Sequence, residues 1–190
     1  VRQMTRALTR NSGLNPQAGS DLPGAADLDA ALPRDRAPAN LHYVCMTQYD
    51  KKFALPVVIP PESLDNILAH VMGQENLRNL RVAETEKYAH VTYFFNGGEE
   101  KEWEGERRIL VPSPRDVPSY DHKPEMSADE VAQRVVDDIG DGYAFCVVNF
   151  ANPDMVGHTG SIPAVIEAVQ TADRCLGRVV ERVSELGGVC

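Results

Sequence analysis

Apolar residues along most of this chain recur with two periods, which predict alternating strands and helices. Residues 90–95 and 145–150 are rich in β-branched and aromatic side chains, which favour strands. The second run is almost continuously apolar, a pattern typical of a central strand that is covered on both faces of a parallel sheet. Shorter strands are expected at residues 41–46, 78–83 and 107–111, the last as a strand that returns after a glycine-rich turn.

Two later segments show the spacing of helices instead. Ser127 and Glu130 form a Ser-x-x-Glu capping box, which predicts a helix from there to about residue 139. A longer helix is expected over residues 162–186, because its apolar residues recur every three or four positions: Ile162, Val165, Ile166, Val169, Leu176, Val179, Val180, Val183 and Leu186. A short helix opened by two prolines is expected at residues 60–72. This alternation predicts an α/β fold in which helices pack on a sheet.

The first forty residues differ in composition from the rest. Residues 1–10 are expected to be helical. Residues 11–40 are rich in Gly, Pro, Ala, Asp and Asn and lack apolar periodicity, which predicts a loop-rich insertion. Residues 41–190 are therefore expected to form the main domain.

Composition and charge narrow the class of protein. The chain has 190 residues, 43% of them hydrophobic, and a net charge of −9. This charge argues against general nucleic-acid binding, which needs a basic face, but leaves a small anionic substrate open. No apolar run of about 18 residues predicts a membrane span, and no signal peptide is recognisable. The four cysteines form no Cys-x-x-Cys pair, so we expect free thiols in a reducing, cytoplasmic compartment.

The segment with the clearest chemistry is residues 149–160, which follows one predicted strand and precedes the long helix. Ligand sites of open α/β sheets lie at the carboxyl ends of strands. Asp154 and His158 offer a carboxylate oxygen and an imidazole nitrogen, a set that suits Mn²⁺ or Zn²⁺ better than Ca²⁺. Both can face one ion if the segment forms a helical turn. An Asp-x-x-x-His pair is common by chance, however, and an Asp154 that only caps the loop is the alternative interpretation.

Lys87 is the second candidate. It precedes the strand predicted at residues 90–95 and can present three N–H donors to an anionic ligand. The alternative is a solvated lysine in a loop. His90 is interpreted as a packing residue rather than a ligand.

Two motifs together resemble the cofactor-independent phosphoglycerate mutases. Residues 87–98 resemble the lysine-bearing motif of that family, and residues 149–160 resemble its first C-terminal metal motif. Four further segments agree with the family in the same order: residues 2–8, 44–50, 111–114 and 123–128. The resemblance covers nearly the whole chain outside residues 11–40.

The resemblance implies an alkaline-phosphatase-like fold and a metal-dependent reaction. Family members interconvert 3-phosphoglycerate and 2-phosphoglycerate with two metal ions, usually Mn²⁺, although Mg²⁺ or Co²⁺ also serve, and a serine carries the phosphoryl group between them. Asp154 and His158 match ligands of one ion, and Lys87 matches a residue that contacts the phosphoryl group. The resemblance also implies a cytoplasmic, monomeric parent without nucleic-acid or membrane partners.

Several parts of the family pattern have no counterpart here. These are the nucleophilic serine, an arginine pair that holds substrate, the Asp-His-Gly-Asn motif and a final ligand histidine. We therefore expect an internal fragment, truncated at both ends, in which residues 1–10 end a linker helix and residues 41–190 form part of a phosphatase-type domain. The isolated chain is expected to be inactive and to bind metal weakly. Another alkaline-phosphatase-like phosphotransferase and a catalytically dead scaffold of this fold remain the alternatives.

Overall fold

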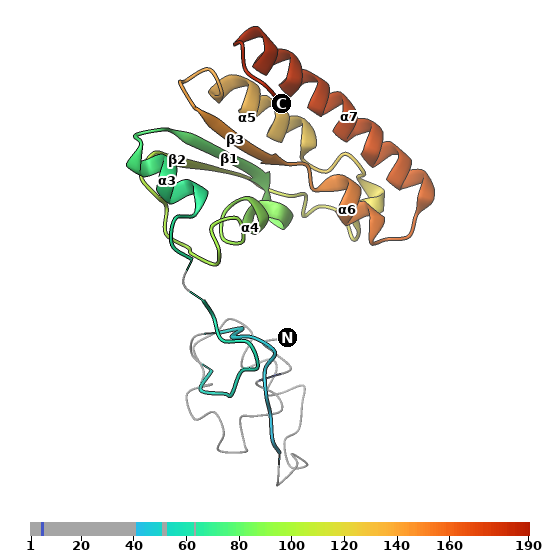
Figure 1. Ribbon diagram of the computed structural model, residues 1–190. Coiled ribbons are helices and arrows are strands. Elements are labelled where there is room, and N and C mark those ends of the chain that lie inside the picture. The colour runs from blue at the N-terminus through green and yellow to red at the C-terminus, as the bar shows by residue number, and fades with distance from the viewer. Residues whose placement is uncertain (1–4, 6–40, 51–52, 63) are drawn as a thin grey trace. The chain divides into compact units, whose positions relative to one another are not determined.

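The structure is a computed structural model that describes residues 5, 41–50, 53–62 and 64–190. It comprises two compact units, Val1–Ser63 and Leu64–Cys190 (Figure 1). The helix predicted at residues 1–10 and the insertion predicted at residues 11–40 lie outside the described residues, except for Thr5. The domain boundaries predicted at positions 10 and 40 stay predictions.

The described part of the first unit is built around one β-bridge. Cys45 and Val57 form this bridge, and the Val58 N–H donates to the Cys45 carbonyl at 2.9 Å. The strand predicted at residues 41–46 is present only as this bridge. Cys45 packs with Phe53 and Leu55 in a small apolar cluster.

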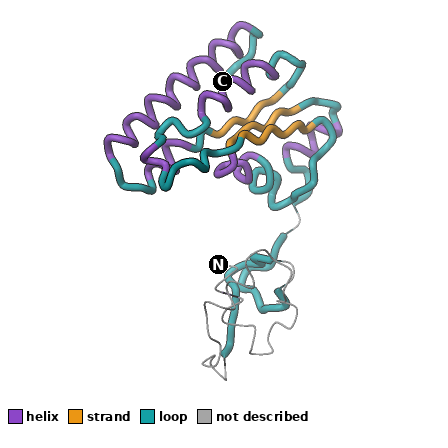
Figure 2. Tube along the Cα trace, turned by 180° about the vertical axis from the view of Figure 1, so that it is seen from behind, coloured by secondary structure: helices purple, strands orange, loops and turns teal. Residues whose placement is uncertain are grey.

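The second unit contains a parallel sheet of three strands in the order β2-β1-β3. The strands are β1 (Asn79–Glu84), β2 (Glu106–Val111) and β3 (Phe145–Asn149). Both pairings of β1 are parallel, and Leu80 lies opposite Arg107 on one side and Cys146 on the other. Helices lie on both faces of the sheet, so the predicted α/β class is confirmed (Figures 1 and 2).

Two details of the sheet differ from the sequence predictions. The central strand is β1, all six of whose residues are buried, whereas β3 lies at an edge and is only half-buried. Residues 107–111 belong to β2, which runs parallel to its neighbour and is not a returning hairpin strand. A hydrophobic run indicates that both faces of a strand are apolar, but it does not identify the neighbours of that strand.

The helices cover the sheet in two layers. On one face lie α5 (Ala128–Asp138) and α7 (Ile162–Glu185), which pack against each other (Figure 1). On the other face lie α3 (Leu68–Gln74) and α4 (Tyr88–Val91). The main core lies under α5 and α7 and contains Leu80, Val82, Val111, Ala128, Val131, Ala132, Val135, Cys175, Val179 and Val183. None of the described helices is long and apolar enough to cross a membrane.

The prediction of a strand at residues 90–95 is wrong. This segment begins in α4 and continues through turns to Gly98. The Phe94 N–H donates to the Ala89 carbonyl at 2.8 Å, and the Asn96 N–H donates to the Thr92 carbonyl at 2.9 Å. Val91 is buried by this arrangement. Packing against the sheet therefore overrides the β-propensity of the segment.

The helix α5 begins where the capping box predicts, but without the predicted hydrogen bond. Ser127 is its N-cap residue, yet the Ser127 hydroxyl donates to the Pro112 carbonyl at 2.7 Å and makes no cap hydrogen bond. The serine thus connects the start of α5 to the segment after β2.

Candidate functional site

The carboxyl ends of β1 and β3 bring the two sequence candidates together. A 3₁₀ turn, η1 (Thr85–Lys87), follows β1, and a short helix, α6 (Asn152–Gly157), follows β3. Because the two strands are parallel neighbours, their carboxyl ends lie at the same edge of the sheet. The Lys87 ammonium forms an ion pair with the Asp154 carboxylate across this edge.

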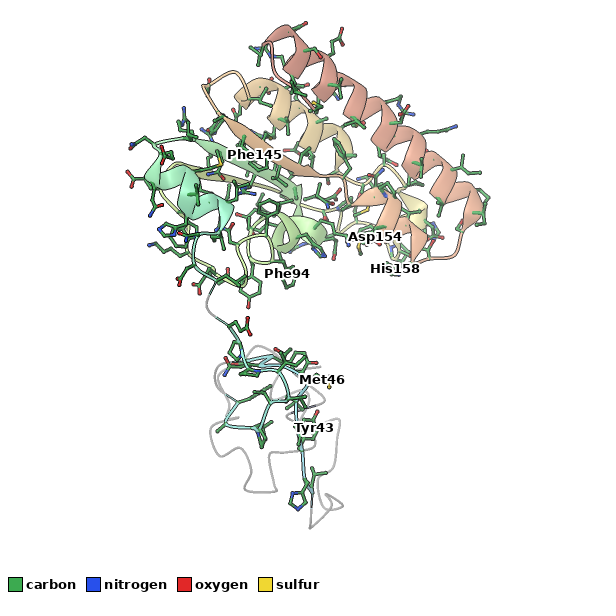
Figure 3. The ribbon with its side chains drawn as sticks, in the orientation of Figure 1. Tyr43, Met46, Phe94, Phe145, Asp154 and His158 are labelled. Atoms are coloured by element: carbon green, nitrogen blue, oxygen red, sulfur yellow. The ribbon has the colours of Figure 1, made fainter. Side chains whose placement is uncertain are left out.

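The helix α6 places Asp154 and His158 on one side, as a helical turn requires. Asp154 lies in its first turn, and His158 is its C-cap residue, whose N–H donates to the Asp154 carbonyl at 3.1 Å. The His158 Nε2 lies 3.6 Å from the Asp154 Oδ1. Figure 3 shows the two side chains together at α6. The loop predicted at this position is therefore a helical turn, the condition on which the metal hypothesis depends.

The charges around Asp154 favour its ionised form. The hydrogen bond from Lys87 has the largest effect and lowers the pKa of the Asp154 carboxyl. Desolvation opposes it with a smaller effect, and the charges of Lys87, His158 and His90 lower the pKa further. Lys87 is mostly buried, with 16% of its side chain exposed, whereas 51% of the Asp154 side chain and 75% of the His158 side chain are exposed. A mostly buried ammonium thus pairs with an accessible carboxylate, and an accessible imidazole lies next to the same carboxylate.

A network of polar side chains holds the turn η1 in place. The Ser113 hydroxyl donates to the Glu84 carboxylate at 2.9 Å and accepts a long hydrogen bond from the Glu86 N–H at 3.4 Å. The Ser113 N–H donates to the Thr85 hydroxyl at 3.0 Å. The segment after β2 therefore fixes the residues directly before Lys87.

Sequence reasoning missed two ionisable groups of this network. Glu84 is fully buried at the end of β1, and burial raises the pKa of its carboxyl, opposed by hydrogen bonds from Ser113 and Ser127. The Tyr120 hydroxyl donates to Glu86 at 2.7 Å, and burial together with this bond raises the pKa of Tyr120 to about 12. A glutamate directly after the strand predicted at residues 78–83 was the signal that the sequence offered for Glu84.

Asn152 anchors the other half of the site. This buried residue donates from Nδ2 to the Ala168 carbonyl at 2.7 Å and to the Pro124 carbonyl at 3.3 Å. The first bond ties α6 to α7, and the second ties it to the segment before α5. The position of Asp154 is therefore set by the fold rather than by a free loop.

Asp154 and His158 can hold a divalent ion only as part of a larger set of ligands. A carboxylate oxygen and an imidazole nitrogen in adjacent turns are suitable donors for a transition metal ion. Over residue 5, residues 41–50 and 53–62, and residues 64–190, no group of three His, Cys, Asp or Glu side chains is placed to share an ion. Catalytic metal sites generally have three or more protein ligands. An ion at this pair would also compete with Lys87 for the Asp154 carboxylate.

The sequence of this chain matches a known protein family and several of its members. The sequence profile of the metalloenzyme superfamily matches residues 12–190. The 2,3-bisphosphoglycerate-independent phosphoglycerate mutase 2 of Methanosarcina acetivorans is 53% identical over 159 residues, which are 83% of this chain and 30% of that protein. The 2,3-bisphosphoglycerate-independent phosphoglycerate mutase of Desulforudis audaxviator is 55% identical over 155 residues, 82% of this chain and 30% of that protein.

A solved structure agrees with these relatives. The Leishmania mexicana phosphoglycerate mutase, crystallised at low cobalt concentration, superposes with a TM-score of 0.71 at 27% identity over 99% of this chain and 32% of that one. The chain therefore spans about a third of the length of the proteins it matches. The resemblance inferred from the six motifs and the predicted fold class are both confirmed.

Proposed function

This chain belongs to the metalloenzyme superfamily, and we propose that it forms part of the phosphatase-type domain of a metal-dependent phosphoglycerate mutase. The proposed reaction interconverts 3-phosphoglycerate and 2-phosphoglycerate, as the names of its relatives suggest. The observation that carries the proposal is the convergence of Lys87, Asp154 and His158 at the carboxyl edge of the sheet.

In this proposal, Asp154 and His158 are ligands of one of two metal ions. Their oxygen and nitrogen donors suit Mn²⁺, with Mg²⁺ or Co²⁺ as substitutes. A bound ion would neutralise charge on the transferring phosphoryl group and lower the pKa of a nucleophilic hydroxyl. The low pKa of Asp154 supports this role, because a carboxylate must be ionised to bind a cation.

Lys87 would bind an oxygen of the phosphoryl group through its ammonium. The turn η1 is held by Ser113, so the ammonium needs little reorganisation to meet an anion. Lys87 now pairs with Asp154, and a bound phosphoryl group would offer it another anionic partner. The serine of a phosphoserine intermediate would lie outside residues 1–190.

The same proposal includes the cellular setting. A phosphoglycerate mutase acts on a small soluble substrate in glycolysis and gluconeogenesis, which favours a cytoplasmic location, and the family resemblance implies a monomeric parent. The free cysteines among the described residues are compatible with a reducing compartment.

A chimera of the Methanosarcina acetivorans mutase tests the proposal. The segment of that enzyme that matches this chain is replaced by the present sequence, and conversion of 3-phosphoglycerate is measured with and without Mn²⁺. We expect metal-dependent activity in the chimera and none in the isolated chain. Asp154→Asn and His158→Asn should abolish turnover, and Lys87→Met should reduce kcat/KM by about 10²-fold or more.

Asp137→Asn is the matched control, because Asp137 is an exposed helical aspartate that bonds only to Gln133 among the contacts described. It should leave turnover unchanged. A folded chimera that keeps full activity with Asp154→Asn would contradict the proposal.

A further inference from the structure

Tyr120 lies between the two segments that carry the site residues. It begins η2 (Tyr120–His122), a single 3₁₀ turn that contacts both α6 and α7. Its ring packs against the apolar cluster that contains Ala151 and Val156, two residues of the α6 segment. Its hydroxyl donates to a carboxylate oxygen of Glu86 in the turn η1 at 2.7 Å. One side chain therefore connects the packing around α6 to the turn that carries Lys87.

Glu86 directly precedes Lys87 and is held at two points. Its N–H donates to the Ser113 hydroxyl at 3.4 Å, and its carboxylate accepts the Tyr120 hydroxyl. The first contact ties η1 to the segment after β2, and the second ties it to η2. Burial raises the pKa of Tyr120 to about 12, so the hydroxyl keeps its proton at neutral pH and remains a donor.

The relative position of Lys87 and Asp154 matters for the proposed chemistry. Lys87 follows β1 and Asp154 follows β3, so the sheet sets only where the two segments begin. An ammonium that meets a transferring phosphoryl group must be aligned with the metal ligands, since a misplacement of about 1 Å can cost on the order of 10²-fold in rate. A contact that connects the two segments beyond the sheet can supply this alignment.

We propose that Tyr120 is a positioning residue for phosphoryl transfer, which fixes Lys87 relative to Asp154 and His158 through its hydrogen bond to Glu86. This inference rests on the proposed function, because it assigns Lys87 to the phosphoryl group. Tyr120 acts through Glu86 and not by contact with the reacting groups. The hydrogen bond carries the effect, and the charge of Glu86 is not required for it.

Tyr120→Phe in the Methanosarcina acetivorans chimera tests the inference, and Tyr143→Phe is its matched control. Both rings pack against an apolar cluster and both hydroxyls bond to a charged side chain, since Arg78 Nη2 donates to the Tyr143 hydroxyl at 3.0 Å. Tyr143, however, lies in the segment before β3, whereas Asp154 lies beyond the other end of that strand.

With Mn²⁺ present, Tyr120→Phe should lower kcat about tenfold and change KM by less than about threefold, because alignment rather than binding is lost. Tyr143→Phe should change neither constant. The melting temperature should fall by a similar amount in the two variants, about 3 °C or less, since each loses one hydrogen bond. A Tyr120→Phe chimera whose kcat falls no more than that of Tyr143→Phe would show a structural role only and overturn the inference.

Variants of Glu86 separate the hydrogen bond from the charge. Glu86→Gln keeps an oxygen acceptor for Tyr120, so its kcat should stay within about threefold of the parent, whereas Glu86→Met should lower kcat as Tyr120→Phe does. Tyr120→Phe combined with Glu86→Met should cost no more than either change alone, because both remove the same bond. Additive losses in the double variant, or an equal loss with Glu86→Gln, would contradict the inference.

A measurement without turnover separates this inference from the proposed function. The order parameter of the Lys87 backbone N–H is measured by NMR relaxation in the isolated chain. It should fall by about 0.1 or more in Tyr120→Phe and stay unchanged in Tyr143→Phe. An unchanged value in Tyr120→Phe would overturn the inference even in an active mutase. A chimera that folds but lacks mutase activity would contradict the proposed function alone, and a fall in the order parameter would still show that Tyr120 holds Lys87 in place.

Discussion

Glu84 is a fully buried ionisable residue at this site. It ends the buried strand β1, and its carboxylate accepts a hydrogen bond from the Ser113 hydroxyl at 2.9 Å. Burial raises the pKa of its carboxyl, so the folded protein binds a proton at Glu84 more readily than the unfolded chain does. Its position next to η1 links the protonation of Glu84 to the segment that carries Lys87.

A pH dependence of stability follows from this shift. Because the pKa of Glu84 is raised on folding, the contribution of Glu84 to the free energy of unfolding is most favourable below the ordinary pKa of glutamate. That contribution is lost as the pH rises through the higher pKa of the folded state. Glu84→Gln cannot ionise, so the variant should lose less stability than the parent as the pH rises across this window. Urea unfolding at several pH values measures the difference, and parallel curves for parent and variant would contradict the prediction.

Asp154 shows how much of the site the sequence could predict. Its spacing from His158 predicted that both side chains face one point, because a helical turn is a local structure. The contact between Lys87 and Asp154 joins segments that are distant in sequence and depends on β1 and β3 being neighbours. The residues that hold Lys87 in place, Ser113 and Glu84, were also beyond prediction, since the bonds that involve them depend on the same tertiary arrangement.

At the scale of elements, local patterns predicted long helices better than strands. The helix α7 spans Ile162–Glu185 against a prediction of 162–186, because many apolar positions define its period. Residues 90–95 have the composition of a strand but form α4 and turns, since their contacts with the sheet decide the backbone conformation. The identity of the central strand was also missed, because a sequence of apolar residues contains no information about strand order.

Gly105, in the turn before β2, provides a prediction about an element boundary. Its φ is +74°, and a Cβ added there would lie 2.8 Å from the Leu77 carbonyl oxygen. Gly105→Ala should therefore cost more than the roughly 1–2 kcal/mol of a left-handed backbone, because the carbonyl must also move. Gly142→Ala is the control, since its φ is +79° and no described atom lies within 4 Å of the added Cβ. Chemical denaturation should show a larger loss for Gly105→Ala, and equal losses would contradict the steric argument.

At the scale of the molecule, the hydrophobic core of the second unit is assembled from its own elements. One cluster lies among β1, β2, α5 and α7, and a second contains Met126, Ala151, Val156, Ala164 and Ala168. All these residues lie within Leu64–Cys190, the second compact unit. A unit with its own core is expected to fold by itself.

Residues 64–190 should accordingly fold without the first unit. We expect the shortened protein to unfold cooperatively, with a circular dichroism spectrum that retains the signal of α5 and α7. Leu80 is fully buried in the main cluster, so Leu80→Ala should lower the free energy of unfolding by about 2–5 kcal/mol in both the shortened and the full chain. Equal losses in the two proteins would indicate that the core does not depend on residues 1–63. A shortened protein that unfolds without a cooperative transition would show instead that the second unit needs the first.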